Sequence, residues 1–156
     1  MRPLDKAVVR RKLEVIVENL RALEPVRHRK KEEYVKDIFL RKAVERMLQE
    51  LIEAAVDINV HIIAESGSPV PEDYYESFIS AGTIGILSPV LAEHLAPSAG
   101  LRNRLVHEYD TLDHAIVLDA VKMVEELYPR YIQGDRGLYL ETRSLTVMRS
   151  RRSGMG

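Results

Sequence analysis

The sequence contains no cysteine in its 156 residues. Disulfides, thiolate metal sites and catalysis by a nucleophilic cysteine are therefore excluded. No run approaches the roughly 18 apolar residues that a membrane-spanning helix needs. Charged residues also interrupt the first twenty positions too often for the apolar core of a secretory signal peptide. These absences predict a soluble, cytoplasmic protein that has no membrane partner.

An excess of one charge is also missing, because 23 lysines and arginines stand against 24 acidic residues for a net charge of -1. Proteins that coat nucleic acid without selectivity usually carry a clear basic excess, so that class is not expected. The basic residues gather in two places, a basic segment at residues 27–31 (Arg-His-Arg-Lys-Lys) and the stretch from Arg130 onward. Both are interpreted as solvated loop and tail, as charge runs usually are.

Apolar residues recur at the three-and-four spacing of amphipathic helices along most of the chain. The predicted helices run from Leu4 to Leu23, from Glu32 to Glu65 without a break, from Pro71 to Ala81, from the cap Ser88-Pro89 through a division at Pro97, and from Thr111 to Tyr131. No convincing strand is found. The sequence predicts an all-α, antiparallel bundle of four to five helices in one domain (residues 1–133), followed by a basic C-terminal tail (residues 134–156).

Familiar enzyme motifs are missing as well: there is no glycine-rich phosphate loop, no His-Glu-x-x-His helix and no Gly-x-Ser-x-Gly elbow. The five histidines lack ligand-like spacing, so neither a metal nor another cofactor is expected. Polar groups concentrate instead between Arg102 and Asp110, around the apolar residues Leu101 and Leu105. This segment is the candidate active site.

Helical geometry restricts how the segment can work. Asn103 and His107 share one helical face, whereas Arg102 and His107 differ by about 140° around the axis. In one arrangement the helix ends near His107, extended backbone places His107 and Tyr109 on the same side, the long arginine reaches round to them, and Thr111 caps the next helix. In the other, the arginine of one subunit meets the histidine of another across a two-fold axis.

An arginine, a histidine and a tyrosine without a carboxylate cluster suit metal-independent cleavage of RNA. Imidazole can move the proton of the ribose 2′-hydroxyl, and a guanidinium stabilises charge on the phosphate. The alternative is structural: Arg102, Glu108 and Asp110 would form a surface ion network, with His107 as a helix cap. Spacing alone leaves both interpretations open.

The pattern Arg102-x4-His107-x-Tyr109, with Asn103 after the arginine, resembles the Arg-x(4-6)-His signature of HEPN-domain ribonucleases and, more narrowly, of the HepT toxins. The similarity extends from about Leu40 to Leu127 and includes residues 41–46, 57–63 and 99–107. It implies a HEPN-like homodimer in which two such segments line a cleft that cuts tRNA or mRNA and leaves a 2′,3′-cyclic phosphate.

The resemblance also implies roles for single residues and a partner. His107 would be the acid-base group, Arg102 the phosphate ligand, and Asn103 and Asp57 supporting residues. In such type VII toxin–antitoxin systems, an MNT-type nucleotidyltransferase antitoxin transfers AMP from ATP to the motif tyrosine, here Tyr109, within a larger hetero-oligomer. The alternative is a non-catalytic HEPN dimer that binds nucleotide or a nucleotidyltransferase partner.

Several other residues have both a structural and a functional interpretation. Asp57 and His61 lie four apart on one helical face, so the structural interpretation is a hydrogen-bonded pair between them. The functional alternative is that Asp57 supports the active cleft. The remaining histidines are interpreted as structural or solvated: His28, His94 and His114. The aromatic residues of the third predicted helix are interpreted as packing or partner contacts rather than as platforms for bases: Tyr74, Tyr75 and Phe78.

Overall fold

The computed structural model describes residues 5–108 and 110–134. Its elements, in chain order, are α1 (Lys6–Leu23), the 3-10 helix η1 (Glu24–His28), α2 (Lys31–Lys36), α3 (Ile38–Glu65), α4 (Tyr74–Thr83), α5 (Pro89–Leu95), α6 (Ser98–His107) and α7 (His114–Gln133). The predicted all-α architecture is therefore confirmed.

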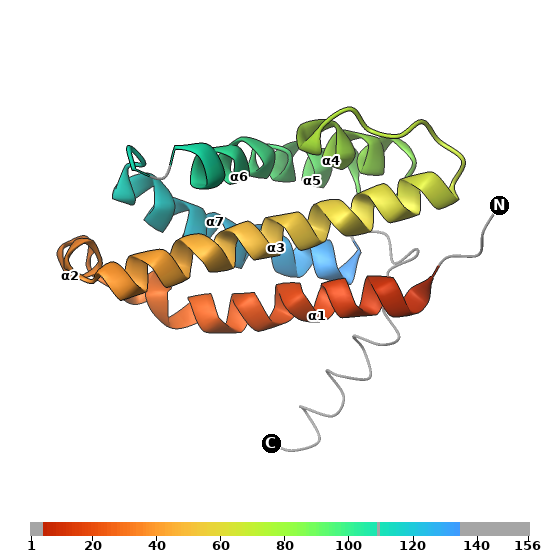
Figure 1. Ribbon diagram of the computed structural model, residues 1–156. Coiled ribbons are helices and arrows are strands. Elements are labelled where there is room, and N and C mark those ends of the chain that lie inside the picture. The colour runs from red at the N-terminus through yellow and green to blue at the C-terminus, as the bar shows by residue number, and fades with distance from the viewer. Residues whose placement is uncertain (1–4, 109, 135–156) are drawn as a thin grey trace, which may run out of the picture.

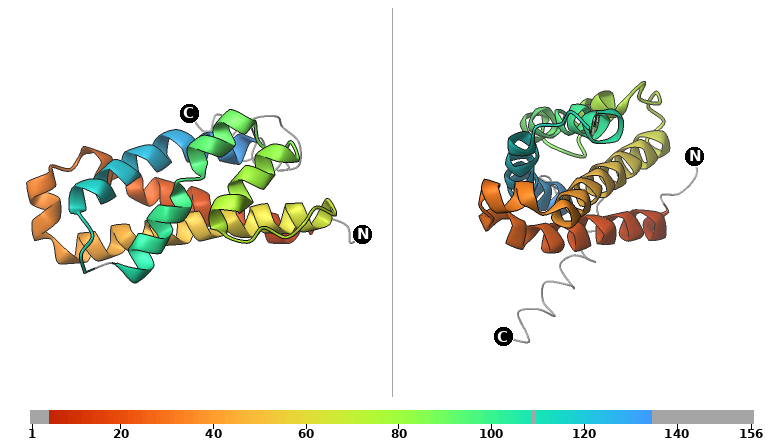
Figure 2. Two further views of the ribbon diagram at one scale, coloured as in Figure 1. Left: turned by 90° about the horizontal axis from the view of Figure 1, so that it is seen from above. Right: turned by 60° about the vertical axis from the view of Figure 1, so that its left-hand side comes forward.

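The bundle is built around α3, its longest helix. Helix α1 runs antiparallel to α3 on one side, α7 returns behind it, and α4, α5 and α6 cross the opposite side (Figures 1 and 2). Because α3 is covered from several directions, apolar residues are buried along almost its whole length, from Val44 to Ile63. This all-round burial explains why its sequence is apolar on more than one face.

Side-chain caps set where most helices begin. Aspartate or serine oxygens accept backbone N–H groups at the starts of α1, α3, α4, α5 and α7, from Asp5, Asp37, Asp73, Ser88 and Asp113. The predicted cap at Ser88 and the division at Pro97 are confirmed.

Two boundary predictions are wrong. The helix predicted from Glu32 to Glu65 is two helices, because Asp37 adopts an extended conformation (φ -100°, ψ 94°) and uses its carboxylate to cap α3. Thr111 does not cap the last helix. Its hydroxyl donates to the Glu108 carbonyl, and Asp113 caps α7 through the Ala115 N–H at 2.8 Å.

A buried polar chain joins α7, α3 and α4. The Tyr131 hydroxyl lies 2.8 Å from Asn59 Oδ1, Asn59 Nδ2 donates to Ser77 Oγ at 3.4 Å, and the Ser77 hydroxyl donates to the Tyr74 carbonyl at 2.7 Å. Buried polar groups with such partners favour one arrangement of the helices around them. These buried hydrogen bonds thereby fix the first turn of α4, which carries Tyr74.

Candidate active site

Helix α6 carries the candidate motif. Leu105 is buried and Leu101 is half-buried, so this side of the helix packs on the core. The helix ends at His107, and the next N–H, that of Glu108, donates to the Arg104 carbonyl at 2.9 Å. The prediction that the helix ends near His107 is confirmed. The imidazole itself is exposed at the helix terminus, where an external molecule can reach it.

Arg102 is held on three sides. Its Nε donates to Glu53 Oε1 at 3.0 Å, its NH1 group donates to Asn103 Oδ1 at 3.3 Å, and its guanidinium carbon lies 4.8 Å from the centroid of the Tyr74 ring. The side chain is only 21% exposed. A guanidinium has five N–H donors, and these two bonds leave three without a partner in the described part of the chain. The arginine is thus oriented by the protein while keeping donors for an anion.

The arginine and histidine do not meet within one chain. Both lie on the same regular helix, about 140° apart around its axis and about 7.5 Å apart along it. Arg102 is turned toward α3 and α4 by Glu53 and Tyr74, while His107 stands at the exposed end. The structure therefore brings Arg102 together with Asn103 but leaves His107 outside that cluster.

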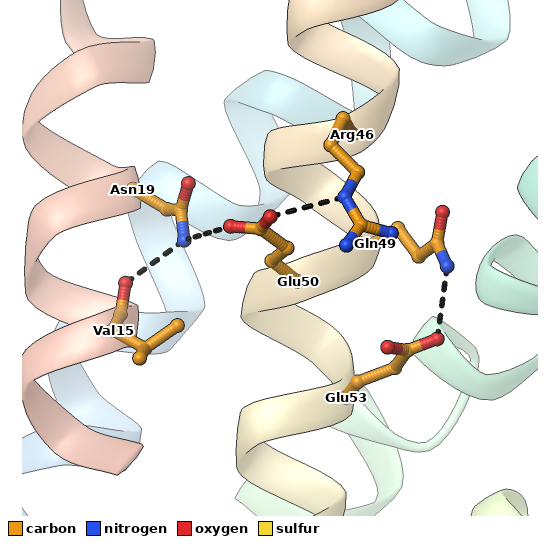
Figure 3. Close-up of polar contacts among 6 residues, drawn as sticks. All are labelled: Val15, Asn19, Arg46, Gln49, Glu50 and Glu53. Carbon is orange, nitrogen blue, oxygen red and sulfur yellow. Dashed lines mark hydrogen bonds and ion pairs between the residues drawn. The ribbon is translucent and has the colours of Figure 1, made fainter. Parts of the chain in front are cut away.

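Glu53 belongs to a polar stripe on α3 that is formed by Arg46, Gln49, Glu50 and Glu53 (Figure 3). Gln49 Nε2 donates to Glu53 Oε1 at 3.1 Å. One turn earlier, Arg46 Nε donates to Glu50 Oε1 at 3.0 Å, and Asn19 Nδ2 on α1 lies 3.5 Å from Glu50 Oε2. Sequence reasoning missed Glu53, because its partner Arg102 lies 49 residues away and only tertiary packing joins them.

Asp57, the predicted supporting residue, lies one turn after Glu53 but binds α1. Its carboxylate forms an ion pair with Lys12 Nζ at 2.8 Å, and both side chains are substantially exposed. His61 instead accepts the Asp5 N–H at 3.3 Å. The predicted Asp57–His61 pair is therefore wrong, and the support that Asp57 gives to the cleft stays a prediction.

His114 has the structural surroundings that were predicted. Its Nε2 lies 3.4 Å from Arg41 NH1, which also donates to the Val35 carbonyl at 2.9 Å. The Tyr34 ring meets the imidazole edge-on at 6.0 Å between centroids, and burial raises the pKa of the Tyr34 hydroxyl well above its ordinary value. This cluster ties α2 and α3 to the start of α7, just beyond the motif.

The other candidates are dispersed. His28 and His94 are exposed, Phe78 is fully buried, and Tyr75 is 53% exposed. Tyr109 lies outside the described residues, as does the predicted basic tail apart from Gly134.

The described residues contain neither a cluster of metal-ligating side chains nor a helix that could span a membrane. Across residues 5–108 and 110–134, no three histidine, aspartate or glutamate side chains converge as metal ligands. Over the same ranges, no helix combines the length and apolar character that crossing a membrane requires.

Comparison with known proteins gives a consistent result. A family model described as ribonuclease HepT-like matches residues 16–132. The tRNA nuclease HepT of Aphanizomenon flos-aquae is 36% identical over 133 residues, covering 85% of this chain and 90% of that protein. The mRNA nuclease HepT of Shewanella oneidensis is 29% identical over 100 residues, covering 64% of this chain and 75% of that protein.

A solved structure extends the similarity to three dimensions. The tri-AMPylated Shewanella oneidensis HEPN toxin, in complex with MNT antitoxin, superposes with a TM-score of 0.72 at 25% identity. The match covers 81% of this chain and 94% of that one.

Proposed function

This chain belongs to the HepT-like ribonuclease family, and from that premise we propose that it is the toxin of a type VII toxin–antitoxin system, cutting RNA in the cytoplasm without a metal ion. The observation that carries the proposal is the arrangement of Arg102, which Glu53, Asn103 and Tyr74 orient while three of its N–H donors stay available. Orientation before the substrate arrives is what electrostatic stabilisation of a transition state requires.

The chemistry follows from the two motif side chains. The RNA 2′-oxygen attacks the adjacent phosphorus while neutral His107 takes the hydroxyl proton. The bond from phosphorus to the 5′-oxygen breaks, and the imidazolium that His107 has become gives its proton to that oxygen. The products are a 2′,3′-cyclic phosphate and a 5′-hydroxyl. Arg102 binds the non-bridging phosphate oxygens, where negative charge accumulates, and Asn103 holds the guanidinium.

A homodimer completes the site in this proposal. One α6 presents its arginine and histidine in different directions, so a phosphate bound to Arg102 needs a histidine from elsewhere. A two-fold axis beside α6 places His107 of a second copy opposite Arg102 of the first. Asp57 is a more distant supporting residue, one turn beyond Glu53 on α3.

The overall test is a gel assay of RNA cleavage in excess EDTA, with chemical analysis of the new 3′ ends. Cleavage that leaves 2′,3′-cyclic phosphates supports the mechanism. No cleavage of tRNA or mRNA under any condition would favour the non-catalytic dimer that binds a nucleotidyltransferase.

Tyr109 is the proposed site of neutralisation. A cognate MNT nucleotidyltransferase would transfer AMP from ATP: the Tyr109 phenol oxygen attacks the α-phosphorus, pyrophosphate leaves and the phenol loses its proton. The added anionic nucleotide would oppose RNA phosphate near His107, two residues away in the sequence. After incubation with ATP and the enzyme, mass spectrometry is expected to find AMP on Tyr109 and none on the Tyr109→Phe protein. AMP on Tyr74 or Tyr75 in the unsubstituted protein contradicts the assignment.

Glu53 is expected to act as a positioning residue for Arg102. In Glu53→Ala the guanidinium loses its 3.0 Å partner, and we expect kcat/KM for RNA to fall by roughly tenfold to a hundredfold, because small misplacements of catalytic groups are costly. Glu53→Gln keeps an oxygen acceptor for Nε, so it should retain most of the activity. Equal activity of Glu53→Ala and unsubstituted protein in a fluorogenic RNA assay would contradict this role.

The matched control is Glu50→Ala, which removes the neighbouring carboxylate of the same stripe. Glu50 binds Arg46 and Asn19 rather than the motif, so its loss should leave kcat/KM unchanged even if stability falls slightly.

A further inference from the structure

A hollow lies between the basic segment and helix α7. Its volume is about 190 Å³, and it is lined by Arg27, Arg29, Lys31, Ala115, Leu118, Asp119 and Lys122. Two stretches far apart in the sequence therefore form one concave surface. Residues 27–31 are exposed, as expected, but the interpretation of them as a loop is wrong, because they include the end of η1 (Glu24–His28) and the first residue of α2 (Lys31–Lys36).

The charge of the hollow is strongly one-sided. Four cationic side chains face a single carboxylate, that of Asp119. None of the four forms an ion pair within the described part of the chain, although Arg27 lies near enough to Glu125 to oppose the rise in pKa that burial causes in that carboxyl. Like charges held around one concavity repel each other and attract a counter-ion. The balance of charge in the lining therefore favours an anion over a cation.

The length of chain between them limits how far the hollow can lie from the candidate active site. Ala115, on its wall, follows His107 by eight residues, and a fully extended chain of that length spans less than about 29 Å. In Figure 1 and in the left view of Figure 2, helix α2, the start of α3, the end of α6 and the start of α7 all lie toward the same end of the bundle. One strand of RNA can thus reach both places.

We propose that this hollow binds a backbone phosphate of the RNA substrate other than the phosphate that is cut, an inference that rests on the proposed ribonuclease function. Arg27 and Arg29 offer bidentate N–H donors to phosphate oxygens, while Lys31 and Lys122 add charge. Ala115 and Leu118 form an apolar wall for the attached ribose. The motif from Arg102 to Tyr109 provides few cations, so a second phosphate site adds affinity for RNA that the motif lacks.

The test measures RNA binding and cleavage separately. In the Arg29→Gln/Lys31→Gln protein, the Kd for a fluorescent 20-nucleotide single-stranded RNA is expected to rise roughly fivefold to tenfold. The slope of log K against log salt should become shallower by about 0.7 for each RNA phosphate that the variant no longer neutralises. Cleavage of long RNA should fall in proportion. Cleavage of a dinucleoside monophosphate, which has only the reacting phosphate, should not change.

Two further variants of the protein test whether the effect is specific to the hollow. Arg11→Gln/Arg21→Gln removes two exposed cations from α1, outside the hollow, and should leave both Kd and the salt slope unchanged. Asp119→Asn removes the opposing carboxylate, so it should tighten RNA binding about twofold. Melting curves confirm that each protein is folded.

Three outcomes would overturn the inference: equal RNA affinity of the hollow and control variants, weaker RNA binding by Asp119→Asn, or a hollow variant that loses only its affinity for an acidic protein partner. Failure of the ribonuclease proposal is distinguishable, because the unsubstituted protein would then cleave neither substrate whatever the RNA affinities.

Discussion

His107→Ala is expected to cleave RNA about a hundredfold to ten-thousandfold more slowly than the unsubstituted protein in excess EDTA, the usual contribution of a general acid-base group. The imidazole is exposed at the end of α6 and makes no contact in the core, so its removal should leave the melting temperature almost unchanged. Single-turnover cleavage of 5′-labelled RNA on denaturing gels measures the effect, and fluorescence polarisation measures the RNA affinity that should persist.

The matched control is His94→Ala. His94 is also an exposed histidine on a short helix, α5, but it lies outside the motif. Its substitution should leave the cleavage rate unchanged, so a loss confined to His107→Ala identifies a local chemical role. Cleavage at the normal rate by His107→Ala would remove this histidine from the mechanism.

Local sequence signals predicted the parts of the fold that local interactions determine. Ser88-Pro89 and Pro97 act through the backbone of their own residues, and both boundaries are where these residues predict them. The break at Asp37 was hidden because apolar spacing continues across it from α2 into α3. Thr111 and Asp113 are both plausible caps, and only the path of the chain between α6 and α7 decides between them.

The residues of the candidate site likewise include some that the local sequence identifies and others that only tertiary packing brings in. Arg102, Asn103 and His107 lie within one short stretch, so their spacing and the family resemblance pointed to them together. Glu53 and Tyr74 reach Arg102 from α3 and α4, and nothing local marks them. Asp57, one turn from Glu53, is rotated about 40° around α3, which is enough to direct it to Lys12 on α1 instead.

Arg102→Ala is expected to reduce cleavage by about a hundredfold to a thousandfold, as the loss of one preorganised donor to a transition state does. Arg102→Lys should recover little of this, because an ammonium group cannot reproduce the bond from Nε to Glu53 together with bidentate binding of phosphate. Neither substitution tells which subunit supplies the histidine.

Mixed dimers answer that question. In a dimer of one Arg102→Ala chain and one His107→Ala chain, a site shared between subunits is doubly damaged at one position and intact at the other. Such dimers, purified through two different affinity tags, are therefore expected to show about half of the unsubstituted activity, although each parent is nearly inactive.

The control pairs Arg102→Ala with a chain carrying both substitutions, a combination that contains no intact shared site and should stay inactive. If Arg102 and His107 acted within one chain, both mixed dimers would be equally inactive, because every site would carry a lesion. Helix α6 favours the shared arrangement, since its regular geometry up to His107 keeps the two side chains about 140° apart and Glu53 holds the arginine against its own α3.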